Sequence, residues 1–287
     1  MKRILSVQDV SCVGKCSQTA ALPIISAMGV ETAILPTAVL STHTAFKNFT
    51  FRDLTDDIPS ISRVWQREGL SFDAIYTGYL GSIRQTELVA ELFRGFSPKL
   101  IFVDPAMGDN GRLYTGFNRD YAMATREICA RADVIAPNLT EACALLEEDY
   151  PGDNYTRRDI EDILRRLCAM GAGTAMVTGV SLDPGRLGVM GYDSREGKLF
   201  SCFRARVERS FHGTGDVFAA ACAGALTLGM PMERAVRLGV DFTVKSIELT
   251  LRDPDAGWYG VNFEQAIPLL LRRTARFRQD KETNHAD

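Results

Sequence analysis

The segment Gly213–Asp216, with the sequence Gly-Thr-Gly-Asp, combines a tight turn with a carboxylate. Its two glycines let the backbone approach a ligand closely, because they carry no Cβ. The small apolar run Val217–Ala225 indicates a buried helix whose first amides form an anion site. Asp216 beside such a site fits a base that takes a proton from a hydroxyl attacking a phosphoryl group. It equally fits an aspartate that caps a core helix, and this fragment alone leaves both interpretations open.

Two further motifs carry acidic side chains after candidate buried strands. Asp104 and Asp109 bracket a turn with the pattern Asp-Pro-x-x-Gly-Asp. Their carboxylates could hold Mg²⁺ beside nucleotide phosphates, although Asp and Gly are also good turn formers. Asn138 and Glu141 mark a strand-to-helix junction and match a capping box. The functional alternative is that both face one edge of a sheet and position a metal-bound triphosphate.

Short apolar runs that end in Gly, Pro or Asp alternate along the chain with helical patterns. This alternation predicts a mostly parallel central sheet with helices on both faces, a three-layer α/β/α sandwich. Ligands bind beyond the carboxyl ends of the strands in such a sheet, so polar residues at those ends should converge. The polar residues that follow the candidate strands are Gln8, Asp9, Thr77, Tyr79, Asp104, Asn138 and Thr178.

The periodicity predicts the individual elements. The parallel strands are expected at Arg3–Val7, Thr32–Leu35, Ala74–Thr77, Leu100–Val103, Val134–Ala136 and Thr174–Thr178. A hairpin is expected from Leu187–Tyr192 and Lys198–Ala205. Helices are expected at 18–28, 84–95, 119–131, 139–147, 156–170, 216–229, 231–250 and 263–276. Residues 1–278 are predicted to form one domain, followed by a polar, disordered tail at 279–287.

Composition excludes several classes of protein. The formal charge of −3 over 287 residues argues against a nucleic-acid partner, which usually demands a basic face. No apolar run reaches the roughly 18 residues of a membrane span, so no membrane association is expected. Seven cysteines, an odd number without a C-x-x-C pair, predict free thiols in a reducing cytoplasm. With three histidines in the chain, a structural zinc site is disfavoured.

Three smaller features admit two interpretations or fail a test. His43, in the polar loop Ser41–Thr44, could bind a ligand or serve the structure alone. Tyr79 could stack on an aromatic ligand or close the edge of the core. The segment Val13–Ser17 follows a strand and precedes a helix, but it is no Walker P-loop. Asp9 and Cys16 stand where that pattern requires Gly and Ser or Thr.

Together, these motifs resemble the ribokinase superfamily, and within it the pyridoxal (vitamin B6) kinases. The resemblance runs from Lys2 to about residue 250, and its most specific signs are the Gly-Thr-Gly-Asp turn and the two strand-end acidic motifs. Thr77-Gly78-Tyr79 and the loop with His43 favour the B6 branch over sugar kinases. The resemblance implies transfer of the ATP γ-phosphate to the 5′-hydroxymethyl group of a pyridine. ATP and Mg²⁺ are the implied cofactors, and the family pattern also admits a monovalent cation.

The resemblance implies a role for each matching residue. Asp216 would be the general base, and the amides of Gly213 and Gly215 would form the anion hole. Asp109 and Glu141 would serve the metal. The nucleotide and its phosphates would contact Asp104, Asn138, Glu141, Thr178 and Thr214. The pyridine pocket would be lined by Asp9, His43, Thr44 and Tyr79, with Tyr114 as a mobile cover.

Two departures from the family pattern matter. The family usually has Ser where this chain has Asp9, and a carboxylate there pairs better with a positively charged or donor-rich group than with an aldehyde. We therefore hypothesise a preference for pyridoxamine or pyridoxine over pyridoxal. The loop after Asp109 is also shorter than in many relatives, which weakens the assignment of Tyr114.

Other functions remain open at this stage. A hydroxymethylpyrimidine kinase shares the superfamily, the Gly-Thr-Gly-Asp turn and an aromatic heterocycle with a hydroxymethyl group. A sugar kinase gains some support from Asp9, but residues 30–60 look too short for the full β lid of that class. A non-catalytic sensor of a vitamer or nucleotide would need no base at Asp216. The family also implies a homodimer.

Overall fold

The computed structural model describes residues 1–283. Its strands are β1 (Arg3–Val13), β2 (Glu31–Thr42), β3 (Phe51–Asp53), β4 (Ala74–Thr77), β5 (Leu100–Val103), β6 (Gly108–Asp109), β7 (Arg112–Leu113), β8 (Val134–Ile135), β9 (Thr174–Asp183), β10 (Arg186–Asp193) and β11 (Lys198–Ala205). Its helices are α1 (Ser17–Ala27), α2 (Ile58–Arg67), α3 (Ile83–Phe96), α4 (Arg119–Cys129), α5 (Leu139–Leu146), α6 (Arg157–Ala169), α7 (Thr214–Thr227), α8 (Met232–Arg252) and α9 (Phe263–Thr283).

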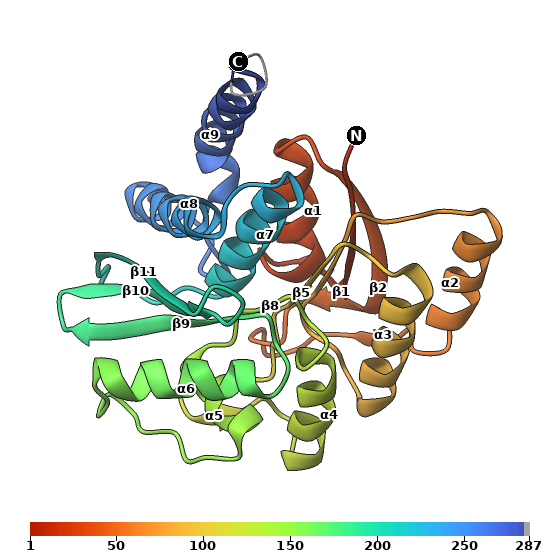
Figure 1. The fold of residues 1–287 in the computed structure, drawn as a ribbon, viewed down its shortest axis with the longest axis horizontal. Coiled ribbons are helices and arrows are strands. Elements are labelled where there is room, and N and C mark those ends of the chain that lie inside the picture. Colours follow the sequence, from red (N-terminus) through yellow and green to blue (C-terminus); the bar gives the residue numbers. More distant parts are fainter. Residues whose placement is uncertain (284–287) are drawn as a thin grey trace.

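One nine-stranded sheet forms the centre of the molecule, in the order β11-β10-β9-β8-β5-β4-β1-β2-β3 (Figure 1). The six strands from β9 to β2 run parallel. The predicted hairpin, β10 and β11, adds antiparallel strands at one edge, and β3 pairs antiparallel with β2 at the other. The chain moves outward from β1 in both directions, so a topological switch point lies between β1 and β4.

Helices cover both faces of this sheet (Figure 1). On one face, α1, α7, α8 and α9 enclose a core that includes Ile24 and Phe242. On the other face, α2 to α6 enclose a second core that includes Leu88 and Leu164. These apolar side chains recur at helical spacing, which buries one stripe of each helix against the sheet. The predicted three-layer sandwich with a mostly parallel sheet is therefore confirmed.

The sequence predicted the ends of three strands too early, and it missed one helix and the short strands β3, β6 and β7. One of the three strands, β9, was expected to end at Thr178 and continues to Asp183. β1 and β2 were expected to end at Val7 and Leu35, but both continue and stay paired as far as Val13 and Thr42. The register of this pairing shifts between Gln8 and Val10. Such pairing depends on the neighbouring strand more than on the sequence of the strand itself. Helix α2 was missed although Ile58, Ile61 and Trp65 lie at helical spacing on the face that packs against the core.

The prediction of a disordered tail at 279–287 was wrong for residues 279–283, which belong to α9. The expected boundary at residue 278 falls inside that helix. Tertiary contacts hold its end in place: Arg278 donates to the carbonyl oxygen of Met28 at 2.9 Å, and Asp280 pairs with Arg234 at 2.9 Å. A polar composition therefore did not prevent helix formation. The last four residues of the predicted tail, 284–287, lie outside the described residues.

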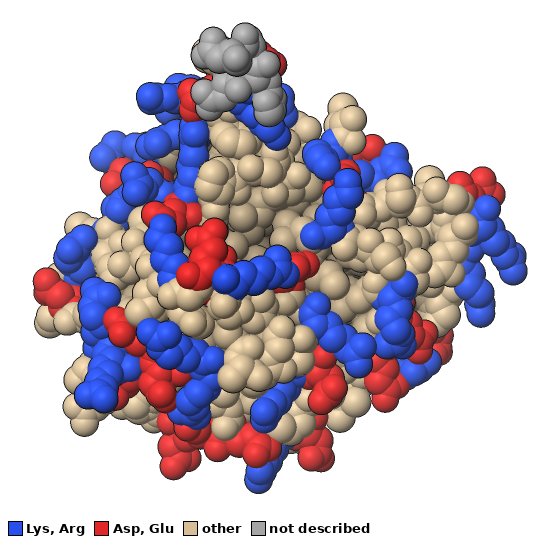
Figure 2. All heavy atoms as spheres, viewed as in Figure 1, with Lys and Arg blue, Asp and Glu red and all other residues tan. Residues whose placement is uncertain are grey.

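Acidic and basic side chains are interspersed over the face drawn in Figure 2. This mixture agrees with the small net charge of the chain. Within residues 1–283, no helix combines the length and apolarity needed to cross a bilayer.

Candidate active site

The predicted polar residues meet at the carboxyl edge of the sheet. Register aligns Val7 of β1 with Thr77 of β4, Thr77 with Val103 of β5, and Val103 with Ile135 of β8. The polar residues that follow these positions therefore share one edge, where an open parallel sheet binds ligands. The polar residues at the ends of β1 and β4 flank the switch point.

The turn before α7 has the geometry of an anion site. Gly213 precedes the helix with a left-handed φ of 75°, a conformation that favours glycine. A Cβ on Gly213 would also collide with the carbonyl oxygen of Lys15, whereas a Cβ on Gly215 would meet open space. Thr214 opens the helix, and its hydroxyl donates to the Phe211 carbonyl oxygen at 3.2 Å. The first-turn amides of a helix have no partner within the helix, so this turn can bind an anion.

Asp216 lies in that first helical turn. Burial raises the pKa of its carboxyl to about 7, with the negative charge of Asp9 as the second cause. The backbone amide of Ser17 hydrogen-bonds the carboxylate and opposes this rise. A carboxylate that titrates near neutral pH can accept a proton and later release it, as general-base catalysis requires.

Asp9 is almost fully buried, with 4% of its surface exposed. The Ser11 hydroxyl donates to its carboxylate at 2.9 Å, and Ser17 forms a second side-chain hydrogen bond to it. Burial nevertheless raises its pKa. Asp9 is thus near enough to Asp216 for its charge to raise the pKa of that carboxyl, and it lies at the switch point.

Asn138 and Glu141 form the predicted capping box at the start of α5. The Asn138 side chain accepts from the Glu141 amide at 3.0 Å, and Glu141 accepts from the Asn138 amide at 2.8 Å. Two further bonds extend the box to the neighbouring turn. The Met107 amide donates to Glu141 at 3.1 Å, and the Asn138 side chain donates to the Gly108 carbonyl oxygen at 2.8 Å. The motif therefore fixes the turn after Asp104 to the helix as well as capping it.

Asp104 and Glu141 lie close together in a poorly solvated environment. Burial raises the pKa of both carboxyls, and for Asp104 the negative charges of Glu141 and Asp216 raise it further. Within the described residues, no hydrogen-bond donor offsets this effect at Asp104. A crowded set of hard oxygen donors that lacks a balancing cation suits Mg²⁺. No three His, Cys, Asp or Glu side chains in residues 1–283 are placed together to hold a metal ion.

The loop after Asp104 carries the other two predicted residues of this region. Asp109 is exposed and accepts hydrogen bonds from the backbone and side chain of Asn110, at 2.9 and 3.0 Å. Tyr114 is 44% exposed. Burial of its hydroxyl and the charges of Glu141 and Asp109 raise its pKa, so this hydroxyl faces the acidic side chains. The position fits the predicted cover over the site.

Thr178 and Tyr79 occupy opposite parts of the same edge. Thr178 forms an isolated parallel bridge with Asn138, which puts it on the side of the predicted nucleotide. Tyr79 packs against Phe117 with ring centroids 5.5 Å apart. Burial raises the pKa of Tyr79, followed by the charge of Asp9, so its hydroxyl lies toward Asp9.

His43 is buried, with 7% of its surface exposed, and both ring nitrogens are occupied. Its Nδ1 accepts from the Ala45 amide at 3.2 Å, so its Nε2 carries the proton that it donates to the Tyr259 carbonyl oxygen at 3.1 Å. Burial and His212 lower its pKa, which keeps it neutral. His43 can therefore offer a ligand its ring surface but no free polar atom. Thr44 beside it is exposed.

The sequence model of the phosphomethylpyrimidine kinase family matches residues 19–259. The chain belongs to this family. A pyridoxal kinase of Rubrobacter xylanophilus is 28% identical over 263 residues, which cover 87% of this chain and 88% of the relative. The resemblance to pyridoxal kinases that the motifs predicted is thereby confirmed.

Two solved structures resemble this chain over most of the length of both proteins. One is a Bacteroides thetaiotaomicron protein described as a phosphomethylpyrimidine kinase, in a crystal form with pyridoxal. It is 36% identical with a TM-score of 0.89, and the match covers 94% of this chain and 95% of that one. The other is pyridoxal kinase from Lactobacillus plantarum, 33% identical with a TM-score of 0.87, over 95% of this chain and 97% of that one.

Sequence reasoning missed two residues of the site in this family member. Ser17, in the segment that was examined as a P-loop, contacts both Asp9 and Asp216. Ser17 would have been identified if every polar residue after the first strand had been considered, and not the Walker pattern alone. Lys15 of the same segment donates to Asn262 and Glu264 at 2.9 Å each, so its ammonium group is tied to the chain after α8.

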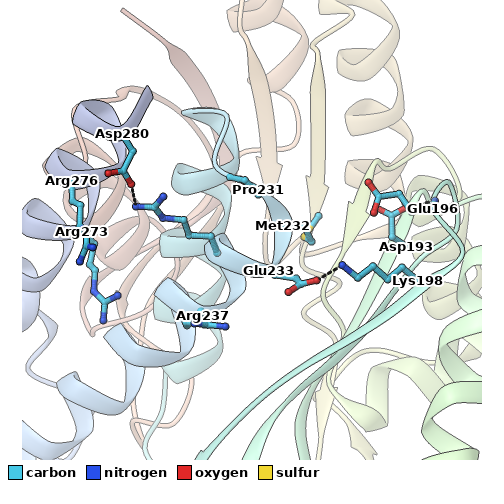
Figure 3. Close-up of a pocket in the computed structure, with 11 residues that line it drawn as sticks. Asp193, Glu196, Lys198, Pro231, Met232, Glu233, Arg237, Arg273, Arg276 and Asp280 are labelled. Atoms are coloured by element: carbon cyan, nitrogen blue, oxygen red, sulfur yellow. Dashed lines mark hydrogen bonds and ion pairs between the residues drawn. The ribbon is translucent and has the colours of Figure 1, made fainter. Parts of the chain in front are cut away.

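A cavity of about 720 Å³ lies far from these residues, between the β10–β11 hairpin, the start of α8 and α9 (Figure 3). Asp193 in its wall pairs with Thr174 at the start of β9, which places it at the opposite edge of the sheet. Acidic and basic side chains line it together, and the pairs Lys198–Glu233 and Arg234–Asp280 span 2.6 and 2.9 Å. This cavity, lined by five basic and four acidic side chains, lies apart from the candidate active site.

Proposed function

We propose that this chain is an ATP-dependent kinase that phosphorylates the 5′-hydroxymethyl group of a vitamin B6 vitamer. The observation that carries the proposal is Asp216, which stands in the first turn of α7 behind a glycine turn and has a pKa of about 7. The pyridoxal kinases among the relatives and the pyridoxal in the Bacteroides crystal form support a B6 acceptor.

In the proposed reaction, the Asp216 carboxylate accepts the proton of the acceptor hydroxyl. The oxygen then bonds to the γ-phosphorus of ATP as the bond from that phosphorus to the bridging oxygen breaks, which releases ADP. The amides of Gly213 and Gly215 and the first turn of α7 stabilise the charge on the transferred group. Positioning and charge neutralisation supply most of the rate enhancement in such a transfer.

The nucleotide half of the site lies around α5 and the end of β9. We propose Asn138, Thr178 and Thr214 as contacts of the nucleotide and its phosphates. The carboxylates of Asp104, Asp109 and Glu141 are the proposed holders of Mg²⁺, in part through water. Bound there, Mg²⁺ would neutralise the triphosphate and the developing charge on the leaving group.

The acceptor half lies at the switch point. We propose Asp9, His43, Thr44 and Tyr79 as its walls, with Tyr114 as a mobile cover. A carboxylate at position 9 favours an acceptor with a donor group, which supports our hypothesis of a preference for pyridoxamine or pyridoxine over pyridoxal. An Asp9→Ser variant with the same ranking of the three vitamers as the wild type would contradict it.

A hydroxymethylpyrimidine kinase is the second candidate, because the matching family and the Bacteroides relative carry that description. Both substrates are aromatic heterocycles with a hydroxymethyl group, and both would use Asp216. A sensor without catalysis is the third candidate, although a base beside an anion site serves it no purpose. A homodimer and a cytoplasmic location remain predictions from the resemblance and from the free thiols.

The test is coupled ADP release from Mg-ATP with pyridoxal, pyridoxamine, pyridoxine, hydroxymethylpyrimidine and ribose, with Asp216→Asn alongside. Turnover of a B6 vitamer, reduced roughly 10²–10⁴-fold in the variant, is the expected result. Turnover of the pyrimidine or the sugar alone would move the chain to that activity. Vitamer binding without turnover of any acceptor would favour the sensor.

A further inference from the structure

The segment 253–262, between α8 and α9, is anchored to the loops of the acceptor half. The amide of Asn262 donates to Thr250 at 2.7 Å, and its side chain accepts from Lys15 at 2.9 Å. The carbonyl oxygen of Tyr259 accepts from His43 at 3.1 Å. These bonds hold the segment against the loops that follow β1 and β2, both of which belong to the carboxyl edge of the sheet.

Trp258 of this segment joins the acceptor loop to the anion site. Its ring centroid lies 4.6 Å from that of Phe46, 5.8 Å from that of His43 and 6.4 Å from that of His212. His212 immediately precedes Gly213 in the chain. The indole therefore stands beside the loop predicted to bind the acceptor and, at the same time, beside the turn predicted to bind the phosphoryl group.

The orientation of the indole leaves part of it open. It stands nearly perpendicular to the rings of His43 and His212, at 73° and 80°, so neither histidine stacks on it. Half of its surface, 50%, is exposed, whereas His43 behind it is buried. A large, partly open aromatic surface at the mouth of a polar site suits a planar aromatic ligand.

We propose that Trp258 contacts the ring of the aromatic acceptor and is a specificity-determining residue for it. This inference rests on the proposed function. It assigns Trp258, from a C-terminal segment of the chain, to the wall of the proposed acceptor pocket. A hydroxymethyl group that reaches Asp216 leaves its ring next to the turn that contains His212. In that position the indole can stabilise a planar heterocycle by a ring contact. A sugar would gain no comparable contact.

Steady-state kinetics give the first test. Trp258→Ala should raise KM for pyridoxine about tenfold, the size of one lost aromatic contact, with kcat and KM for ATP little changed. Trp258→Phe should restore most of the affinity. The matched control is Trp65→Phe on α2, where Trp65 packs with Phe72 of the following loop and Phe96 of α3, and this variant should behave as the wild type. An unchanged KM for pyridoxine in a folded Trp258→Ala variant would overturn the inference.

Quenching of fluorescence by acrylamide gives a second test that needs no turnover. The chain has two tryptophans, so Trp65→Phe reports Trp258 alone and Trp258→Phe reports Trp65 alone. Pyridoxine with ADP should protect Trp258 from acrylamide and leave Trp65 unaffected. Protection without phosphorylation would uphold the contact and defeat the proposed kinase activity. Phosphorylation without protection would defeat the contact alone, and the absence of both would defeat both.

Discussion

Asp9 and Asp216 share a neighbour, Ser17, whose side chain hydrogen-bonds Asp9 and whose backbone amide hydrogen-bonds Asp216. The three residues come from β1, the start of α1 and the start of α7. Asp9 raises the pKa of Asp216, while the Ser17 amide lowers it. The acidity of the proposed base is thus set jointly by a residue of the acceptor pocket and by the loop between them.

This arrangement predicts the pH profile of the enzyme. The kcat/KM for pyridoxine should rise with pH through about 7, as Asp216 loses its proton. In Asp9→Asn the profile should move to lower pH, because the loss of a neighbouring negative charge lowers the pKa of Asp216. Activity assays of both enzymes from pH 5 to 9 measure the rise and its shift.

Asp120→Asn, which removes an exposed acid on α4, is the control for the change in net charge. Its profile should match that of the wild type. An Asp9→Asn profile that stayed in place would mean that Asp9 does not act on the ionisation of the base.

The raised pKa of Asp216 also predicts a cost in stability. Between its ordinary value of 3.8 and about 7, the folded chain holds a proton at Asp216 that the unfolded chain has released. The contribution of Asp216 is therefore most favourable at low pH and is lost as pH rises through about 7. Asp216→Asn should raise Tm at pH 8 and change it less at pH 5, although it removes activity. Thermal unfolding at the two pH values measures this, and an equal shift at both would contradict it.

Most of the fold could be predicted from sequence because the parallel strands are short, apolar and separated by amphipathic helices. Leu88 and Leu92 of α3 illustrate the signal, since their spacing predicted a helix and both are buried. The extensions of β1 and β2 could not be predicted in the same way. Ladder pairing with a neighbouring strand stabilises them, and a single strand carries no local sign of it.

The candidate site also has residues that could be predicted from the sequence and residues that could not. The positions of Asp104 and Asn138 at the carboxyl edge could be predicted because each closely follows a strand, and the edge of a parallel sheet gathers such residues. Trp258 could not be found by this rule. The hydrogen bond between His43 and Tyr259 joins positions 216 apart, and only the folded chain brings that segment back over the first strands.

Asp104 gives a prediction about the metal. Asp104→Asn should raise Tm in the absence of Mg²⁺, because it replaces a carboxyl whose ionised form is disfavoured by burial and by Glu141 and Asp216. The same change should raise the Mg²⁺ concentration needed for half-maximal activity. Thermal unfolding in EDTA and a Mg²⁺ titration at fixed ATP measure the two effects. A less stable variant with an unaltered Mg²⁺ requirement would assign Asp104 a structural role.

Ser17 opens α1 with a φ of 47°, a left-handed conformation that is unusual for a residue with a Cβ. Ser17→Gly and Ser17→Ala both remove the hydroxyl that contacts Asp9, so they differ in backbone preference and in one buried methyl group. The glycine variant should be more stable than the alanine variant by about 1 kcal/mol, because glycine adopts this conformation without strain. An ordinary helical position would give the opposite order, since alanine is the better helix former. Urea unfolding of the two variants distinguishes the alternatives, and a more stable alanine variant would show that the turn at Ser17 carries no such strain.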